Sequence, residues 1–452
     1  MGPKKPEIEY IHLRRLAELR QNKSPPEGEY KEAYESLRKL AQGAMKKGPF
    51  SVTIGKSFPH IAASGDPRDF LSYAPMHYNN EEKDGQVIYV RRDGKRNPDC
   101  SEVKDQSQLE ALAENLTFLC LGYFLLHKSE YANHAISLIN TFFINSETRM
   151  NPHVDYGQVV RGANNPTGKG RAEGIISTRF LARVANVLPL LEDHEGYASV
   201  QRPTHLWYAN YLQWLLESPI GKKEAAKKNN HHTFYLVQVA AIQQLLYAEG
   251  KYRCFPAQKT IQDYYTNVLP QQINKKTGNQ PLEASRTLQF HYLEFNLHAA
   301  IFLAELGIDA ACCDVYCQQQ LIPLAATHMI GYCNNKNMKE DMTEGVRTVE
   351  IIKSRYGDTD DHCYTRFLEM ARHCKDAENI SGPKNAIARL WFRKNPQYNE
   401  ISTSNEINHT PAIINSSGSS SGTGEGGRVN SNIESKGSKV MAFFDKMLHH
   451  HH

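Results

Sequence analysis

The sequence lacks several features that would assign it to a common class of protein. It contains no uninterrupted run of about 18 apolar residues, the length that a helix needs to cross a membrane, so we expect no membrane span. It has neither the HExxH motif of zinc proteases nor the GxSxG motif of serine hydrolases. A phosphate-binding loop is also absent, because Gly162 and Gly168 are one residue too far apart and Gly170 replaces the Ser or Thr.

A metal site is not expected either, although the chain has nine cysteines. Four of them are close together in sequence: Cys312, Cys313, Cys317 and Cys333. They contain no CxxC pair that is matched by a second CxxC or by a pair of histidines. No cofactor motif is visible, so we expect no cofactor. If the protein is secreted, the odd number of cysteines leaves at least one thiol free or paired outside the chain.

The charge balance is nearly even, with 53 Lys and Arg against 49 Asp and Glu and a net charge of +4. This mild basic excess suits a polyanionic partner. The sequence has no basic helix with interleaved aromatic residues, so nucleic acid is not an expected partner.

The expected location is extracellular. Five sequons, which are glycosylation sites in secreted proteins, begin at Asn22, Asn115, Asn379, Asn408 and Asn415. Residues 1–6 lead into a charged segment and show no signal peptide. Because His449–His452 resemble a purification tag, we expect the signal peptide to be missing from this sequence.

Composition divides the chain into three regions. Residues 1–47 predict a helical lead-in. Residues 48–400 predict the main domain, and its first part, residues 48–105, is rich in Pro, Gly, Asp and Asn, which is typical of a long lid-like loop. Only residues 86–90 of this loop look like a strand. Residues 401–452 predict a flexible tail rich in Ser and Gly.

The rest of the main domain predicts helix after helix, because apolar positions recur at helical spacing and Gly, Pro and Asn separate the runs. The expected helices are 106–126, 130–144, 172–192, 203–217, 233–249, 257–268, 281–306, 309–332 and 359–375. Helices joined by short loops pack as antiparallel pairs, so the predicted fold class is all-α. Beyond residues 86–90, a strand is expected only near Ile351.

The stretch Asn229-Asn230-His231 places an amide beside an imidazole at the start of a long apolar helix. On the pattern alone, Asn229 and Asn230 are N-caps, whose side-chain oxygens accept hydrogen bonds from unpaired backbone N–H groups. Asn230 and His231 then lie at the N-terminal mouth of this helix.

With four further motifs in the same order, this stretch resembles the alginate lyase family of polysaccharide lyases. The early motif is Ser64-Gly65-Asp66-Pro67 with residues 69–75, the middle ones are Met150-Asn151-Pro152 and Gly170-Arg171 with residues 174–176, and the last is residues 283–286 followed by His291-Tyr292. The resemblance covers residues 10–395. It implies an (α/α) toroid with a central cleft that binds an anionic polysaccharide.

The resemblance also implies that Asn230 and His231 approach the carboxylate of a uronic acid. β-Elimination removes the C5 proton and expels the C4 oxygen, and donors must first neutralise the carboxylate. Asn230, His231 and Arg286 are the residue types that this step requires, and Tyr292 is the candidate acid and base. A free phenol has a pKa of ~10, so we expect the positive charges of Arg286 and His231 to lower it.

Arg286 and Tyr292 are six residues apart, which separates them by about 120° on a regular helix. Both side chains point inward only if the helix is irregular between them. Otherwise Arg286 forms a surface ion pair with Glu283, and Tyr292 is an aromatic residue of the core.

Further contacts with the sugar are expected from six residues: Lys56, Tyr73, Asn151, Gln158, Arg161 and Arg171. The alternative role for most of them is the capping of loops and helices. The family has aromatic residues and a proline after Ala74-Pro75, where this chain has residues 76–80 with the sequence Met-His-Tyr-Asn-Asn. The sugar subsites of this chain therefore depart from the family pattern.

The expected function is the cleavage of a uronic-acid polysaccharide, such as alginate or glucuronan, by β-elimination without a metal. The first alternative is a carbohydrate-binding protein that keeps the helical toroid and has no turnover. A glycoside hydrolase is the second, although no convincing pair of carboxylates is visible. The sequence predicts neither the polymer, nor an endo or exo mode, nor the oligomeric state.

Overall fold

The computed structural model describes residues 8–22, 26–83, 85–248, 255–310, 314–316, 319–334 and 338–392. Contacts between Cα atoms group residues Met1–Ser402 into one compact unit, and all features below belong to it. The predicted tail at residues 401–452 lies outside the described residues, so its boundary stays a prediction.

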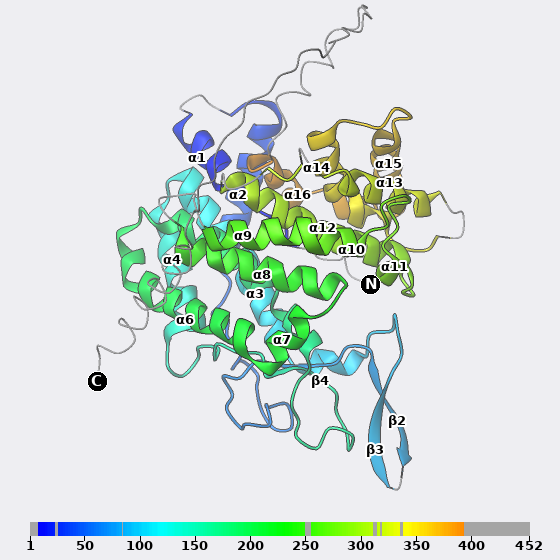
Figure 1. The fold of residues 1–452 in the computed structure, drawn as a ribbon. Coiled ribbons are helices and arrows are strands. Elements are labelled where there is room, and N and C mark those ends of the chain that lie inside the picture. Colours follow the sequence, from blue (N-terminus) through cyan, green and yellow to red (C-terminus); the bar gives the residue numbers. More distant parts are fainter. Residues whose placement is uncertain are drawn as a thin grey trace, which may run out of the picture. The chain divides into compact units, whose positions relative to one another are not determined.

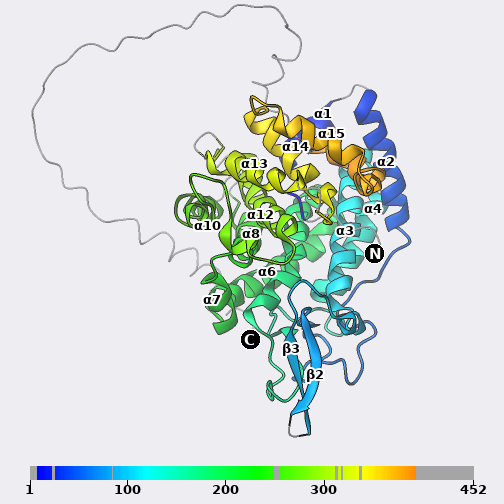
Figure 2. The ribbon, with the colours of Figure 1, turned by 90° about the vertical axis from the view of Figure 1, so that its right-hand side faces the viewer.

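Four helices that are largely buried form the centre of the fold: α3 (Asp105–Leu126), α5 (Phe180–Val187), α8 (Asn230–Tyr247) and α12 (Gln289–Asp309). They pack in chain order, α3 on α5, α5 on α8 and α8 on α12. Figures 1 and 2 show α8 beside α12. In α12 nearly every side chain is buried, as expected for a helix enclosed by others.

The central helices pack against a second set: α4 (Ser129–Ile139), α6 (Ala198–Glu217), α9 (Phe255–Asp263) and α13 (Leu321–Cys333). α4 lies on α3, both α6 and α9 lie on α8, and α13 lies on α12. This arrangement of helix on helix is the (α/α) toroid, and the predicted all-α fold class is confirmed.

The remaining helices are α1 (Leu13–Gln21), α2 (Gly28–Ala44), α7 (Pro219–Ala225), α10 (Leu269–Gln272), α11 (Pro281–Ala284), α14 (Val346–Tyr356), α15 (Cys363–Arg372) and α16 (Pro383–Ala386). The strand expected near Ile351 is wrong, because this residue lies within α14. Val346, Val349 and Ile352 are buried at a spacing of three residues, which is the period of a helix face.

The predicted helices at 172–192 and 309–332 differ in extent from those in the structure. The expected helix at 172–192 consists of a 3₁₀ segment at Ala172–Thr178, then α5, then a second 3₁₀ segment at Leu188–Leu191. In the first 3₁₀ segment Gly174 packs directly on Gly157, and a Cβ atom on Gly174 would lie 2.3 Å from backbone atoms of Gly157. The expected helix at 309–332 starts only at Leu321.

The strands form two small pairs in and beside the predicted lid. β1 (Leu71–Tyr73) pairs in parallel with β4 (Tyr156–Val159), which the sequence did not predict. β2 (His77–Lys83) pairs with β3 (Gln86–Arg91) in an antiparallel hairpin that projects from the helices near β4 (Figure 1). β3 confirms the strand expected at residues 86–90.

The N-terminal segment before α1 is part of the core. The Ile11 N–H donates to Asn186 Oδ1 on α5 at 2.8 Å, and the Leu13 N–H donates to Asp309 Oδ2 on α12 at 2.6 Å. The ring of His12 contacts Glu305 and Asp309. The lead-in thus connects two central helices.

Among the described residues, α3 is long and apolar enough to cross a membrane by length and composition. It is largely buried between α2, α4 and α5, as the core helix of a toroid is. Its sequon residue Asn115 is 8% exposed and donates to the Ala111 carbonyl oxygen, so it is inaccessible to glycosylation.

Candidate active site

An interruption between α11 and α12 brings Arg286 and Tyr292 together. Residues 285–288 are not helical, and Arg286 Nη2 donates a hydrogen bond to Tyr292 Oη at 2.9 Å. The guanidinium carbon lies 3.8 Å from the centre of the Tyr292 ring. The irregularity expected from the six-residue spacing is confirmed, whereas the prediction of one continuous helix over 281–306 is wrong.

Asp93, which follows β3, binds the same guanidinium. Arg286 Nη2 donates to Asp93 Oδ1 at 2.9 Å, and Arg286 Nε donates to Asp93 Oδ2 at 3.3 Å. This hydrogen bonding lowers the pKa of Asp93 to about 2, so its carboxylate is charged at neutral pH. Arg286 therefore pairs with the lid and forms no surface ion pair with Glu283.

Tyr292 is 8% exposed, and its hydroxyl lies against Arg286. Burial raises the pKa of Tyr292, and the charge of Arg286 offsets this only in part. The expected lowering of the pKa is therefore wrong for the protein without substrate. At neutral pH Tyr292 is a protonated phenol.

Asn230 is the first residue of α8 and is buried. Its backbone N–H donates to Glu283 Oε1 and its Nδ2 donates to Glu283 Oε2, both at 2.7 Å. The N-cap position belongs to Asn229, whose side chain makes no capping hydrogen bond. The capping role suggested by the sequence pattern is therefore wrong for both asparagines, and Glu283 satisfies the first N–H of the helix instead.

His231 follows Asn230 and points toward α7. Its Nδ1 lies 2.7 Å from Glu224 Oε1, and the carboxylate of Glu224 is fully buried. A carboxylate at Nδ1 holds the imidazole in one orientation and leaves Nε2 as the nitrogen available to a ligand. The side chain of His231 is 17% exposed, so a ligand can reach it.

Glu283 joins the four predicted catalytic residues into one site. Its carboxylate binds Asn230, and it interacts electrostatically with His231, Arg286 and Tyr292. Burial raises the pKa of Glu283, and the two bonds from Asn230 reduce the increase. The structure thus places all four predicted residues around one buried carboxyl group; their catalytic roles stay predictions.

Arg171 and Gln158 lie on the same side of the site as Glu224. Arg171 Nη2 donates to Gln158 Oε1 at 2.8 Å, and Arg171 interacts electrostatically with Glu224. Burial lowers the pKa of Arg171, and its Nε is buried without a hydrogen-bond partner. Gln158 has a φ of 49°, a left-handed conformation uncommon outside glycine, which turns its side chain toward Arg171.

The guanidinium of Arg161 packs against two aromatic rings, those of Tyr73 and of Tyr89 in β3. The Arg161 guanidinium carbon lies 4.2 Å from the centre of the Tyr73 ring and 4.5 Å from that of Tyr89. Asp99 accepts a hydrogen bond from Arg161 Nη2 at 3.1 Å. Glu102 lies 4.0 Å from Arg161 Nη1. The two rings and the two carboxylates together hold the guanidinium in position.

Lys56 and Asn151, two of the predicted sugar contacts, form contacts within the protein. Lys56 Nζ donates to Asp105 Oδ2 at 2.6 Å and also to the carbonyl oxygens of Pro67 and Asp69. All three hydrogens of its ammonium group are therefore in use. Asn151 Nδ2 donates to Asp69 Oδ1 at 2.6 Å and to Asp66 Oδ2 at 3.1 Å. Their predicted contact with substrate stays a prediction.

Met76 and His77 occupy the part of the lid that departs from the family. Met76 Sδ lies 3.8 Å from Arg286 Nη2. His77 Nδ1 is buried without a partner, and burial together with the charge of Arg171 lowers the pKa of His77. Met76 thus contacts the Arg286 side of the site, and His77 lies near Arg171.

Three acidic residues of the site were not predicted as functional: Glu224, Glu283 and Asp93. Each binds a predicted residue across a turn or from a distant segment. Glu224 and Glu283 are buried, whereas the side chain of Asp93 is 31% exposed. Buried carboxylates are rare and need a partner, which is the one signal that applies to Glu224 and Glu283. The sequence did not show that these two residues would be buried.

No group of three or more His, Cys, Asp or Glu residues that could hold a metal ion occurs in the described part of the chain. Cys312, Cys313 and Cys317 lie outside that part. That the protein needs no metal or cofactor stays a prediction.

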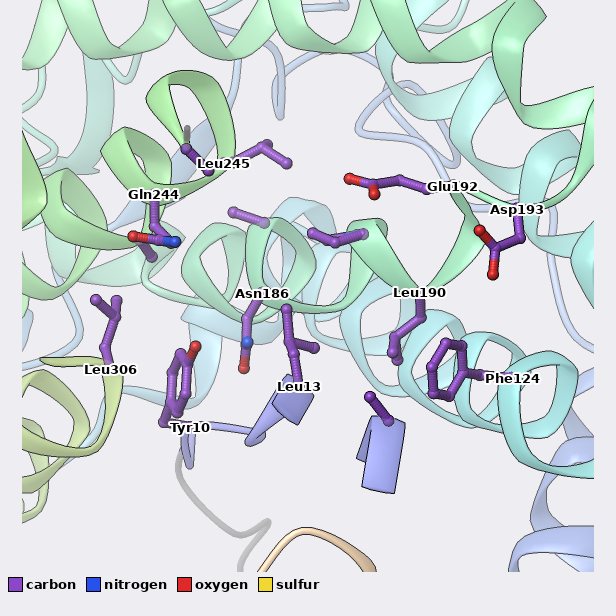
Figure 3. A pocket seen from close by; sticks show the side chains of 15 residues that line it. Tyr10, Leu13, Phe124, Asn186, Leu190, Glu192, Asp193, Gln244, Leu245 and Leu306 are labelled. Atoms are coloured by element: carbon purple, nitrogen blue, oxygen red, sulfur yellow. The ribbon is translucent and has the colours of Figure 1, made fainter. Parts of the chain in front are cut away.

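A cavity lies at the other end of the central helices, between the N-terminal segment and the ends of α3 and α8 (Figure 3). Tyr10, Asn186, Gln244 and Leu306 line it. Gln244 follows Asn230 by 14 residues in α8, a rise of roughly 21 Å along the helix. This cavity is therefore remote from the candidate active site.

The chain was compared with known families and structures. The family model for alginate lyases matches residues 56–320, more than half of the chain. The chain is similar to the crystal structure of an alginate lyase from Bacteroides ovatus, with a TM-score of 0.70 and 26% identity, over 86% of this chain and 99% of that chain.

A second structure, alginate lyase A1-III from Sphingomonas species A1, has a TM-score of 0.48 and 13% identity, over 85% of this chain and 95% of that chain. No curated protein sequence matches the chain.

Proposed function

The chain belongs to the alginate lyase family and is a polysaccharide lyase, and on this premise we propose that it cleaves a polyuronate at the site around Glu283. The observation that carries the proposal is the convergence of Asn230, His231, Arg286 and Tyr292 on this carboxyl group. They supply hydrogen-bond donors, a cation, a base and an acid around one carboxyl group.

Neutralisation of the substrate carboxylate falls to Arg286 and Asn230. The fork of Arg286 already binds a carboxylate, that of Asp93, so its geometry suits a uronate. One hydrogen of Asn230 Nδ2 binds Glu283, and the second forms no hydrogen bond within the described residues. We assign this second hydrogen to the substrate carboxylate. A neutralised carboxylate accepts the charge that develops when the C5 proton is removed.

Tyr292 is suited to give a proton to the leaving oxygen. Because burial raises its pKa, the phenol is protonated at neutral pH, and its hydroxyl is held by Arg286. When the bond between C4 and its oxygen breaks, the oxygen takes the phenolic proton. The resulting phenolate lies beside the guanidinium, which stabilises its charge.

Removal of the C5 proton needs a base, and two groups are candidates. His231 presents Nε2, and the buried carboxylate of Glu224 at Nδ1 stabilises the imidazolium that forms. Tyr292 could serve only as a phenolate, which its raised pKa disfavours. We therefore assign His231 as the base and Tyr292 as the acid, so that the C4=C5 double bond forms as proton and leaving group depart.

The polymer is held by the basic and aromatic groups next to these residues. Arg171 with Gln158, and Arg161 between Tyr73 and Tyr89, are the proposed sugar contacts. Alginate and glucuronan both present the carboxylates that these groups recognise. Such polymers occur outside cells, so we also propose an extracellular location.

A panel of uronic-acid polymers tests this proposal. Alginate, its mannuronate-rich and guluronate-rich fractions, and glucuronan are each incubated with the protein while ultraviolet absorbance of the unsaturated product is followed. Growth of absorbance with at least one polymer supports the proposal and identifies the substrate. Binding without absorbance on any of them would indicate a carbohydrate-binding protein without turnover.

A further inference from the structure

Arg183 lies on α5 with its guanidinium at a second cavity, which no residue of the candidate active site lines. The cavity has a volume of about 110 Å³ and lies between the N-terminal segment, α3, α5, α14, α16 and the turns that follow α16. Ile8, Phe118, Phe180 and Trp391 supply much of its apolar wall. A cation thus faces a largely apolar space.

Arg183 forms no hydrogen bond, ion pair or ring contact with any residue in the described ranges, and its Nε is inaccessible to solvent. Burial lowers the pKa of Arg183 to about 10, a value at which the guanidinium is still charged at neutral pH. The residue as a whole is partly buried. A charge that loses contact with water without gaining a partner is unfavourable, so natural proteins usually supply one.

The carboxylates nearest in the cavity are already bound to other cations. Both oxygens of Glu9 accept hydrogen bonds from Arg347, at 2.5 and 3.1 Å, and Glu9 Oε1 also accepts one from Trp391 Nε1. Glu114 pairs with Lys384. Neither carboxylate forms an ion pair with Arg183, although both act on it electrostatically.

The other polar groups of the wall are also occupied. Thr117 Oγ1 donates to the Ala113 carbonyl oxygen, and Asn385 Nδ2 donates to the carbonyl oxygens of Asn379 and Ser381. Arg183 is therefore the group in this wall whose donors are free. Its planar fork matches two oxygens of one carboxylate or phosphate group.

We propose that this cavity is a binding site for a small oxyanion, a carboxylate or a phosphate, with Arg183 as its ligand. The anion would sit between the N-terminal segment, α5 and the turns after α16. It would supply the negative charge that pairs with Arg183. Two charge-assisted hydrogen bonds correspond to a dissociation constant on the order of 1 mM.

Isothermal titration calorimetry on the full chain tests this site, with inorganic phosphate and acetate as separate probes at constant ionic strength. We expect one saturable site per chain for at least one probe. Arg183→Gln should abolish it, and Arg183→Lys, which keeps the charge and loses the fork, should weaken it several-fold. Arg286→Gln, which removes the cation of the cleft, should leave it intact. The probe that binds distinguishes phosphate from carboxylate recognition.

Thermal unfolding provides a second readout. At ten times the dissociation constant the anion should raise the Tm of the wild type by about 1–2 °C, and that of Arg183→Gln not at all. An equal rise in both, or binding that Arg286→Gln removes and Arg183→Gln retains, would overturn the proposal. So would the absence of binding by both probes. If Arg183→Gln fails to fold, Arg183→Lys takes its place. A dissociation constant of Arg183→Lys equal to that of the wild type would also overturn the proposal.

Discussion

At the scale of single residues, the site depends on three carboxyl groups that orient other side chains, and two of them, Glu224 and Glu283, are buried. Glu283 binds the backbone and the amide of Asn230, Glu224 binds His231, and Asp93 binds Arg286. Each of the three groups that would contact a uronate thus has an acidic partner. Such preorganisation lets donors act at the moment of reaction without first reorienting.

Tyr292→Phe keeps the ring and its contact with Arg286 and removes the hydroxyl. If Tyr292 protonates the leaving oxygen, turnover should fall by at least about 10²-fold, the usual contribution of a general acid. Polymer binding should change little. Kinetics of product formation and equilibrium binding of polymer by the same variant check this. Turnover at the parent rate in the folded variant would remove Tyr292 from the mechanism and leave it as an aromatic residue of the core.

Glu283→Gln should reduce kcat/KM through Asn230. The amide of a glutamine offers one oxygen in place of two, so it cannot accept both hydrogen bonds from Asn230. The loss should not exceed the about 10²- to 10³-fold expected for Asn230→Ala, because Glu283 acts through that residue. The double variant should therefore be no slower than Asn230→Ala alone. Independent, multiplying losses would contradict this positioning role.

At the scale of elements, the site exists because two helices begin where they do. α8 begins at Asn230 with its first N–H on Glu283, and the interruption at residues 285–288 turns Arg286 back over Tyr292. The lid contributes Asp93 from the residues after β3. At the opposite end of the central helices, His12 attaches the N-terminal segment to α12.

His12 gives stability that depends on pH. Burial alone would lower its pKa, but the charges and hydrogen bonds of Glu305 and Asp309 outweigh burial and raise the pKa to about 9. A raised pKa stabilises the fold fully below the ordinary value of 6.5, and this contribution is lost as pH rises through about 9. His12→Gln should therefore lower the free energy of unfolding by up to about 3 kcal/mol near pH 6.

The difference between wild type and His12→Gln should shrink toward pH 10, as measured by denaturant unfolding at several pH values. The pKa of Glu305 is lowered, so its carboxylate stays charged between pH 6 and pH 10. The change in stability over this range therefore does not come from titration of Glu305. A difference that is the same at pH 6 and pH 10 would show that His12 acts through packing alone.

At the scale of the whole molecule, the sequence predicted what depends on local pattern. Apolar runs at helical spacing placed α3, α6, α8 and α12, and the six-residue spacing of Arg286 and Tyr292 predicted an interruption in the helix. The sequence pattern missed what depends on distant partners. The parallel pairing of β1 with β4, the contact of Gly174 with Gly157 and the burial of Glu224 join separate segments.

The same limit explains Lys56 and the pKa of Tyr292. A lysine in a loop looks like a free cation, yet the fold buries it against Asp105. A tyrosine near two cations looks like a group of lowered pKa, yet the packing that brings Arg286 to it also removes water. In both cases desolvation, which a sequence does not show, decides the outcome.

Salt dependence is a property of the whole cleft. Arg161, Arg171 and Arg286 would face a polyanion, and ions screen such attraction beyond about 10 Å at 0.1 M ionic strength. Affinity for the polymer should therefore fall several-fold between about 0.05 M and about 0.5 M salt. Titrations of polymer at the two ionic strengths check this, and unchanged affinity would mean that the polymer is not held by a basic cleft.

The central claim is that the protein cleaves a polyuronate by elimination, and the ratio of two products tests it most directly. Unsaturated ends, from ultraviolet absorbance, and new reducing ends are counted in the same reaction mixture. Elimination creates one of each per bond cleaved, so the account predicts a ratio of about one throughout the reaction. New reducing ends without absorbance would show hydrolysis and contradict the account.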